Sequence, residues 1–341
     1  MGEKTLIGLL ENCPKNQTIG DNLVRAWSKI NSGKYKKIVC AISGGSDSDV
    51  MLDIIWQCDK DGKVEYVWFD TGLEYQATKD HLNLLKEKYD IEIKPYRAIV
   101  PIPISCKKYG QPFISKNSSE MIDRLQRHGF QWENESLVVL LERYCDWDMK
   151  KQDWIGCKGA LMWWCNANKS IQFNIAYNKY LKEFMVQNPP RFKISSKCCQ
   201  YAKKDVLHKL VTSEGYDLNV FGVRRAEGGI RQTAYKSCFD ENGDGYDNYR
   251  PLFWYTNSDK EDYESHYGVK HSKCYTEYGL ERTGCAGCPF GRDFEKELKI
   301  IEKYEPKLLV AVNNIFGDSY EYTRRYREFC KERDDEKKRN N

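Results

Sequence analysis

An apolar run that leads directly into a glycine- and serine-rich turn is the feature that most constrains what this chain can fold into. The run occupies residues 38–42, and apolar residues with helical spacing follow the turn. This order predicts a buried strand, a tight turn and a helix. The turn consists of Ser43, Gly44, Gly45, Ser46, Asp47 and Ser48.

A turn of this composition is suited to binding an anion. Glycines let the backbone approach closely, serine hydroxyls donate hydrogen bonds, and the first turn of the following helix presents free N–H groups. The turn lacks the lysine of the P-loop, G-x-x-x-x-G-K-S/T, and does not fit the dinucleotide fingerprint G-x-G-x-x-G. It predicts a phosphate or pyrophosphate site of another kind, the alternative being an ordinary strand-to-helix turn.

Strands and helices alternate after this turn. Residues 64–69 form a second predicted strand, residues 78–89 have helical periodicity, residues 91–94 read as a third strand, and residues 218–223 are again sheet-like. This alternation predicts an α/β fold with a doubly wound, mostly parallel sheet. Ligands bind such sheets beyond the carboxyl ends of the strands, where the glycine-serine turn is expected. The second strand runs into Asp70, Thr71 and Gly72.

The remaining sequence suggests three regions. Residues 1–35 are expected to form N-terminal helices, residues 36–292 the main domain, and residues 293–341 a charged helical tail. Within the main domain, residues 105–190 read as a helical insertion rich in aromatic residues. Core packing explains its tryptophans better than base stacking does. These tryptophans include Trp147, Trp154, Trp163 and Trp164.

Composition excludes several classes of protein. The 341 residues carry a net charge of +4, which is too small to indicate a nucleic-acid-binding protein by itself. No secretory signal and no apolar run long enough to cross a membrane is visible, so we expect a soluble cytoplasmic protein. In that compartment, fourteen cysteines indicate metal or thiol chemistry rather than disulfides.

Four cysteines have the spacing of a ligand set. Cys198 and Cys199 are adjacent, and Cys285 and Cys288 form a C-x-x-C. Four thiolates hold either zinc or an iron–sulfur cluster. Adjacent cysteines point in divergent directions, which favours the larger cluster over tetrahedral zinc. A redox C-x-x-C beside two unrelated buried cysteines is the remaining alternative. The other ten cysteines are expected to be core or surface thiols.

With these motifs the chain resembles the sulfonucleotide (PAPS/APS) reductase family of the PP-loop adenine nucleotide alpha hydrolase superfamily, in its iron–sulfur branch. The resemblance runs from about residue 36 to 292. It rests on S-G-G-x-D-S at 43–48, D-T-G at 70–72, a G-x-R-x-x-E-x-x-x-R-like segment at 222–231, and the four cysteines.

The resemblance implies roles for these residues. Residues 43–48 would hold the phosphates of an adenine nucleotide, with Asp47 binding Mg²⁺ or capping the helix, and residues 70–72 would line the nucleotide. The four cysteines would hold a 4Fe-4S cluster beside the site. Three arginines would neutralise phosphate charge, oriented by a glutamate that otherwise forms an ordinary helix-surface pair. These four residues are Arg224, Arg225, Arg231 and Glu227.

One departure from the family decides between activities. The reductases attack their substrate with a cysteine in a C-terminal E-C-G-L-H motif, whereas this sequence offers only Cys330, flanked by Phe329 and Lys331. The resemblance therefore implies an ATP pyrophosphatase that forms AMP and pyrophosphate and activates a nucleic acid for sulfur transfer. An APS/PAPS reductase that releases sulfite and a non-catalytic nucleotide- and Fe–S-binding subunit are the alternatives. A cysteine desulfurase or thiol reductant would be its partner, and a homodimer remains open.

Overall fold

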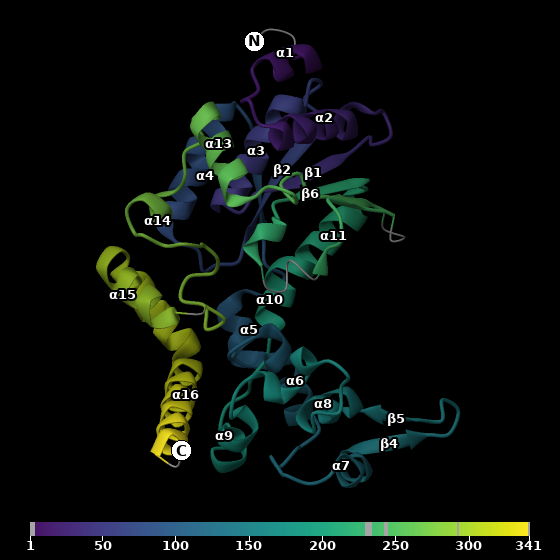
Figure 1. Ribbon diagram of the computed structural model, residues 1–341, viewed down its shortest axis with the longest axis vertical. Helices are drawn as coiled ribbons and strands as arrows, with labels where there is room; N and C mark the ends of the chain where they lie inside the picture. Colours follow the sequence, from purple (N-terminus) through teal and green to yellow (C-terminus); the bar gives the residue numbers. More distant parts are fainter. Residues whose placement is uncertain (1–3, 229–233, 242–244, 292, 340–341) are drawn as a thin grey trace. The chain divides into compact units, whose positions relative to one another are not determined.

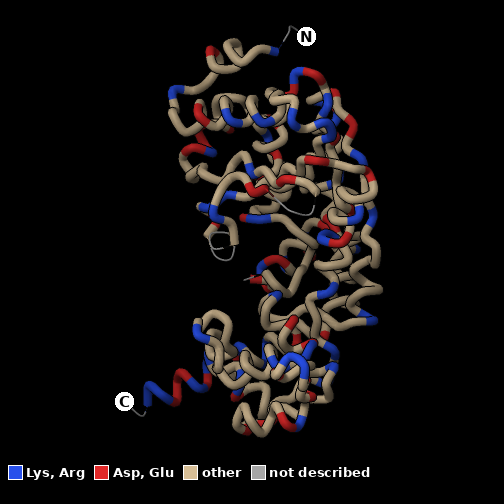
Figure 2. Tube along the Cα trace, turned by 90° about the vertical axis from the view of Figure 1, so that its right-hand side faces the viewer, with Lys and Arg blue, Asp and Glu red and all other residues tan. Residues whose placement is uncertain are grey.

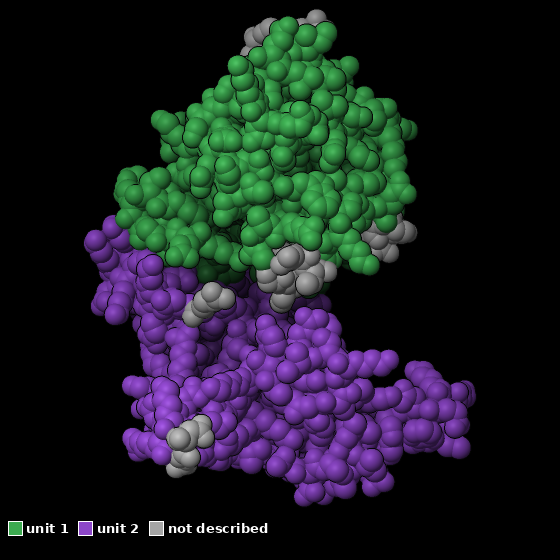
Figure 3. Space-filling model, viewed as in Figure 1, with its two compact units in different colours: residues 1–99, 202–286 green, residues 100–201, 287–341 purple. Residues whose placement is uncertain are grey.

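The computed structural model describes residues 4–228, 234–241, 245–291 and 293–339, and the chain divides into two compact units (Figure 3). The first unit comprises Met1–Ile99 and Ala202–Ala286, and the second comprises Val100–Tyr201 and Gly287–Asn341. Each unit therefore joins two segments that are far apart in the sequence. The region from 105 to 190, expected as an insertion, lies within the second unit together with the C-terminal helices.

The described part of the first unit is built around a six-stranded sheet with the order β3-β2-β1-β6-β8-β7. Its neighbouring strands β1, β2 and β6 are labelled in Figure 1. All neighbouring strands are parallel except β7, which runs antiparallel to β8 at one edge. This is the α/β, mostly parallel arrangement that the sequence predicts. The strands are β1 (Ile38–Ala41), β2 (Val64–Asp70), β3 (Ile93–Arg97), β6 (Leu218–Phe221), β7 (Phe239–Asp240) and β8 (Asp247–Tyr249).

Helices cover both faces of this sheet. Ile38 and Cys40 of β1 pack into a core formed with α2, α3, α4 and α13, whereas Val39 packs on the opposite face with Leu210 and Val211 of α11. Because both faces of β1 are buried, its sequence is continuously apolar. The helices of this unit are α1 (Leu6–Glu11), α2 (Gln17–Asn31), α3 (Ser46–Cys58), α4 (Gln76–Tyr89), α11 (Asp205–Glu214), α13 (Asn257–Tyr267) and α14 (Lys273–Thr276), with a 3-10 turn at Arg225–Glu227.

The strand order changes direction between β1 and β6. From β1 the chain proceeds outward to β2 and β3, while β6 pairs with the other side of β1. A crevice forms at such a switch point, beyond the carboxyl ends of the two strands. The glycine-serine turn follows β1 and the arginine segment follows β6. The two segments approach closely at Gly222, where a Cβ would lie only 3.3 Å from the carbonyl oxygen of Asp47. The absence of a side chain at Gly222 allows this close approach.

The second unit has a separate, aromatic core. Trp163 and Trp164 are fully buried, as the packing interpretation of these tryptophans predicts. Tyr322 of the C-terminal helix belongs to the same core, where its ring contacts Phe113 and Phe184. Trp147 and Trp154 instead face each other across a two-stranded hairpin. The elements are α5 (Ile102–Tyr109), α6 (Lys116–Arg127), α7 (Leu137–Tyr144), β4 (Cys145–Asp148), β5 (Asp153–Gly156), α8 (Lys158–Trp164), α9 (Leu181–Gln187), α10 (Lys197–Cys199), α15 (Phe294–Tyr304) and α16 (Pro306–Arg339), with 3-10 turns at Ile171–Phe173 and Ile175–Tyr177. A π-helical turn, Gln200–Lys204, follows α10.

Charge is dispersed along the chain. In the view of Figure 2, lysines and arginines are interspersed with aspartates and glutamates, in keeping with the small net charge. Within the described residues, no helix combines the length and the apolar character needed to cross a membrane.

Candidate functional site

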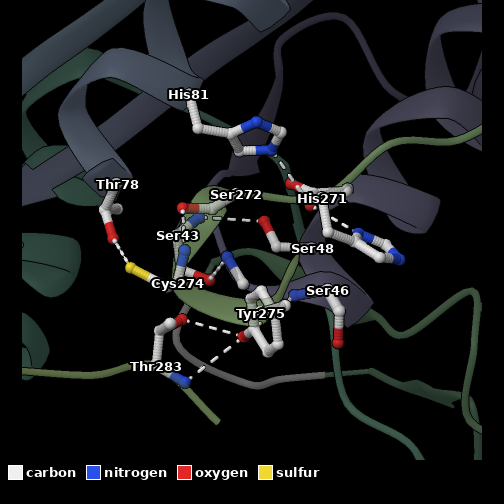
Figure 4. A network of polar contacts seen from close by, with 12 residues as sticks. Ser43, Ser46, Ser48, Thr78, His81, His271, Ser272, Cys274, Tyr275 and Thr283 are labelled. Carbon is white, nitrogen blue, oxygen red and sulfur yellow. Dashed lines mark hydrogen bonds and ion pairs between the residues drawn. The ribbon is translucent and has the colours of Figure 1, made fainter. Parts of the chain in front are cut away.

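The glycine-serine turn forms a tight loop between β1 and α3 in the first unit (Figure 4). Gly44 has φ +67°, in the left-handed region that favours glycine, and a Cβ there would lie 2.8 Å from Thr78 Cγ2. The backbone N–H of Ser43 donates to Ser48 Oγ at 2.9 Å, which closes the loop. The backbone conformation and the close packing therefore favour glycine at position 44, and the hydroxyl of Ser48 closes the loop.

Replacing Gly44 by alanine should destabilise the protein more than a left-handed φ alone explains. Gly33→Ala is the matched control, because Gly33 has φ +75° and no atom lies within 4 Å of the position that a Cβ would take there. We expect Gly33→Ala to cost about 1 kcal/mol of unfolding free energy, and Gly44→Ala a further ~1–3 kcal/mol from the contact with buried Thr78. Denaturant titration measures both, and equal losses would contradict the tight packing of the loop.

Tyr275 holds the first turn of α3 from the side. Its hydroxyl accepts hydrogen bonds from the backbone N–H groups of Ser46 and Thr283, each at 3.2 Å (Figure 4). The helix begins after Gly45, which has no capping side chain. The N–H groups of this turn are the donors that a bound anion would use. Tyr275 therefore occupies one N–H group, that of Ser46, that a bound anion would use. The sequence motifs did not single out this tyrosine.

Asp47, at the start of α3, forms ion pairs with two cationic side chains. Its Oδ1 lies 2.9 Å from Arg224 Nε and 3.0 Å from Lys260 Nζ. Burial raises the pKa of Asp47, but the charges of Lys260 and Arg224 outweigh it and leave the pKa below its usual value. Asp47 is therefore an ionised carboxylate that positions two cations, and it lies within the helix rather than at its N-cap.

The predicted arginines Arg224 and Arg225 have different environments in the structure. Arg224 is 7% exposed and also donates from Nη1 to Asn257 Oδ1 at 2.9 Å. Its backbone N–H donates to Glu227 Oε1 at 3.2 Å. Arg225 is exposed, and its guanidinium lies over the ring of Trp254. Only Arg224 is thus fixed at the loop, whereas Arg231 lies outside the described residues.

The turn after β2 reaches the same edge of the sheet. Gly72 N donates to Asp70 Oδ1 at 2.9 Å, and both the N–H and the hydroxyl of Thr71 donate to Glu74. Burial raises the pKa of Glu74. Thr71 Oγ1 also lies 3.6 Å from Cys285 Sγ. The predicted residues Asp70, Thr71 and Gly72 therefore form a stiff turn that contacts the first cysteine of the C-x-x-C.

A buried chain of charged side chains lies behind the loop. Asp49 is fully buried, and its Oδ2 lies 2.9 Å from His271 Nδ1 and 3.0 Å from His81 Nε2 (Figure 4). His271 Nε2 lies 2.8 Å from Glu264 Oε1. Burial lowers the pKa of His271, but its bonds to Asp49 and Glu264 prevail and raise the pKa to about 9. His271 is therefore an imidazolium between two carboxylates at neutral pH.

This histidine should make stability depend on pH. Because its pKa is raised in the folded protein, its stabilising contribution is complete below the ordinary value of 6.5 and is lost as the pH rises through about 9. We expect the difference in unfolding free energy between the wild type and His271→Asn to shrink over that interval. His266→Asn, at an exposed histidine of α13, is the control. A difference that stays constant from pH 6 to 9.5 would contradict a charged His271.

Three of the four predicted ligand cysteines lie in the second unit. Cys198 shares hydrogen bonds with the thiols of Cys106 and Cys199, and Cys288 is close enough to act on it electrostatically. Sequence spacing did not indicate Cys106, which comes from α5. Cys285 belongs to the first unit. Across the described residues, no three His, Cys, Asp or Glu side chains are gathered as metal ligands.

The backbone around Cys288 is firmly held within the second unit. Gly287 has φ +61°, its N–H donates to Glu297 Oε1 at 3.0 Å, and its carbonyl accepts from the Tyr320 hydroxyl. A Cβ at Gly287 would lie 2.7 Å from that hydroxyl. Glycine is therefore the residue that fits inside this C-x-x-C. The thiol chemistry suits a metal or cluster, while the arrangement of the side chains does not by itself form a complete ligand set.

The sequence matches the phosphoadenosine phosphosulfate reductase domain over residues 37–113. Residues 37–113 are therefore similar to a domain of this family. The matched PAPS reductase domain segment contains β1, the glycine-serine loop, α3, β2 and the turn after it. It does not extend to the arginine segment or to the four cysteines. No curated protein matches the sequence.

Three solved structures that are similar to this chain share little sequence with it. A PAPS reductase from Candida auris is 13% identical, with 84% of this chain and 96% of the reductase covered at a TM-score of 0.39. The U34-tRNA thiolase NcsA from Methanococcus maripaludis, described with its 4Fe-4S cluster, is 14% identical, with 92% and 79% covered at 0.37. An NH3-dependent NAD synthetase from Campylobacter jejuni is 10% identical, with 93% and 96% covered at 0.36. Likeness at this level carries no information about the substrate.

Proposed function

We propose that this chain is an ATP pyrophosphatase that splits ATP into AMP and pyrophosphate and so activates a nucleic acid for sulfur transfer. The observation that supports it is the pair of cations on Asp47. Arg224 and Lys260 come from different elements and are largely buried. Both contact Asp47 at the end of the glycine-serine loop. Two fixed cations beside a helix N-terminus suit a polyphosphate, because transfer at phosphorus is catalysed mainly by positioning and charge stabilisation.

The proposed reaction has two steps. An oxygen of the acceptor attacks the α-phosphorus of ATP, the bond to the bridging oxygen of the β-phosphate breaks, and pyrophosphate leaves. A persulfide from a cysteine desulfurase, or hydrosulfide itself, then displaces AMP from the activated acceptor. Where the donor is a persulfide, a second thiol attacks its inner sulfur, so that the S–S bond breaks, the transferred sulfur stays on the acceptor and the two donor thiols leave as a disulfide. Residues 43–48 bind the phosphates and Arg224 stabilises the charge that develops on pyrophosphate. Asp70, Thr71 and Gly72 line the nucleotide.

The reductase alternative requires a nucleophilic thiolate, for which Cys330 is the candidate. In the second unit, Cys330 Sγ lies 3.5 Å from the carbonyl oxygen of Lys179, to which it donates. Burial raises the pKa of this thiol. A raised pKa lowers the fraction of thiolate, which is the opposite of what a nucleophilic cysteine needs. This environment favours ATP cleavage over attack on a sulfonucleotide.

The cysteines support a separate part of the proposal. We assign Cys198, Cys199, Cys285 and Cys288 to a 4Fe-4S cluster on the chemistry of four thiols, since clusters are held by cysteine thiolates. No step of the reaction above depends on this cluster.

One comparison tests the proposed function. The full chain, purified anaerobically, is incubated with MgATP and either tRNA or DNA, and released pyrophosphate is measured. Parallel samples with APS or PAPS and thioredoxin are assayed for sulfite. The proposal expects pyrophosphate that depends on nucleic acid, and no sulfite. Sulfite release that is lost in Cys330→Ser would establish the reductase instead, and nucleotide binding without either product would indicate a non-catalytic subunit.

A further inference from the structure

The glycine-serine loop, residues 43–48, contains no lysine, yet the ammonium group of a distant lysine contacts it. Lys260 belongs to α13, more than two hundred positions after the loop in the sequence. Its Nζ donates to Ser46 Oγ at 2.8 Å and lies 3.0 Å from Asp47 Oδ1. The side chain is only 12% exposed. Lysine is among the residues least often buried, so this position needs an explanation.

The carboxylates around Lys260 fix its ammonium in one place. Asp47 lies on the loop side, and Glu264, one turn farther along α13, lies 3.3 Å away. Glu264 is itself held by His271, whose other ring nitrogen meets buried Asp49. A free lysine side chain loses considerable rotamer entropy when it binds a ligand. Here that entropy is already lost in the folded protein, which is the arrangement of a preorganised binding group.

We propose that Lys260 is the phosphate-binding lysine of this site, contacting the phosphate that Ser46 binds. The proposal rests on the proposed function and names a residue that none of the motifs contains. P-loop proteins carry such a lysine inside the loop itself. In this chain α13 supplies the cation from a distant segment, and Glu264 and His271 are positioning residues that act through it.

The alternative is that Lys260 only neutralises Asp47 in an ion-pair network of the fold. The two roles differ in what a substitution changes. A purely structural lysine would alter stability without altering the preference for phosphorylated ligands. A phosphate-binding lysine alters affinity for ATP and pyrophosphate while affinity for adenosine, which has no phosphate, stays the same.

Binding measurements on the full chain test the proposal. Calorimetry with inorganic pyrophosphate, MgATP and adenosine is carried out on the wild type, Lys260→Met, Lys260→Arg and the control Lys273→Met, whose side chain is 65% exposed on α14. We expect Lys260→Met to weaken pyrophosphate and ATP binding about 10- to 100-fold, the usual range for a lost charge-assisted hydrogen bond. Lys260→Arg should recover part of the loss, and Lys273→Met should bind as the wild type does.

The results test the role of Lys260 and the proposed function separately. Equal pyrophosphate affinity of folded Lys260→Met and wild type would overturn the assignment of Lys260, while the proposed function would stand if both bind ATP. Wild-type binding of pyrophosphate but not ATP would overturn the proposed function and leave the lysine assignment to the variant data. A wild type that binds neither ligand overturns both.

A second measurement does not depend on the variant folding. The wild type is acetylated with an amine-reactive ester in the presence and absence of pyrophosphate, and modified lysines are quantified by mass spectrometry. Pyrophosphate should protect Lys260 and leave Lys273 unprotected. Equal modification of Lys260 under both conditions would overturn the assignment.

Discussion

Arg224→Ala is expected to lower the rate of pyrophosphate release from ATP by about 100-fold, the usual effect of removing one group that stabilises transition-state charge. Arg224 is the buried arginine of the segment after β6, and Asp47 fixes its guanidinium at the loop. Its loss also leaves Asp47 with Lys260 as its remaining close cation. The measurement is a coupled pyrophosphate assay at saturating ATP and acceptor.

Two further arginine variants give this prediction its contrast. Arg225→Ala should have a much smaller effect, because that side chain is exposed and stacks on Trp254. Arg25→Ala, at an exposed position of α2, should leave the rate unchanged. Equal losses in Arg224→Ala and Arg225→Ala would contradict the distinction that the structure draws between the two neighbours. A thermal unfolding curve for each variant separates loss of activity from loss of folded protein.

Cys198→Ser is expected to remove most of the bound iron from anaerobically purified protein. Cys198 is buried among the thiols of Cys106, Cys199 and Cys288, so its loss removes the centre of the sulfur-rich part of the second unit. Iron and acid-labile sulfide analysis, with a visible spectrum, measures the effect. Cys165→Ser, outside this group, is the control.

The iron content of Cys106→Ser, measured in the same way, tests whether Cys106 is a ligand. Because Cys106 hydrogen-bonds with Cys198, Cys106→Ser distinguishes a neighbouring thiol from a ligand. Full iron content in Cys106→Ser, together with loss in Cys198→Ser, agrees with the four assigned ligands. Full iron in Cys198→Ser would contradict the assignment, and an iron-free wild type that contains zinc would replace the cluster with a zinc site.

The loop and its strand were predictable because their determinants are local. Continuous apolar residues specify a strand buried on both faces, and Gly44 supplies the left-handed φ that the following turn needs. The meeting of Arg224 with the loop also follows from sequence order, since parallel strands bring their carboxyl ends to one edge. Strands β7 and β8 are only two and three residues long, too short for a periodic signal.

The cations and the buried histidine chain could not be predicted in the same way. Lys260, Glu264 and His271 lie on or just after a polar helix that carries no motif, and Lys260 and His271 pair with Asp47 and Asp49 of α3. Only the packing of α13 on α3 brings these charges together. Likewise, the aromatic core of the second unit includes Tyr322 of α16, which is far in sequence from the phenylalanines Phe113 and Phe184 that its ring contacts.

The products formed from ATP test the central claim most directly. The full chain is incubated with MgATP, nucleic acid and sulfide, and the phosphorus products are identified by ³¹P NMR. Cleavage between the α- and β-phosphates predicts AMP and pyrophosphate in equal amounts from the wild type and far less from Arg224→Ala. ADP and inorganic phosphate as the products, or unchanged ATP with every acceptor, would contradict the account.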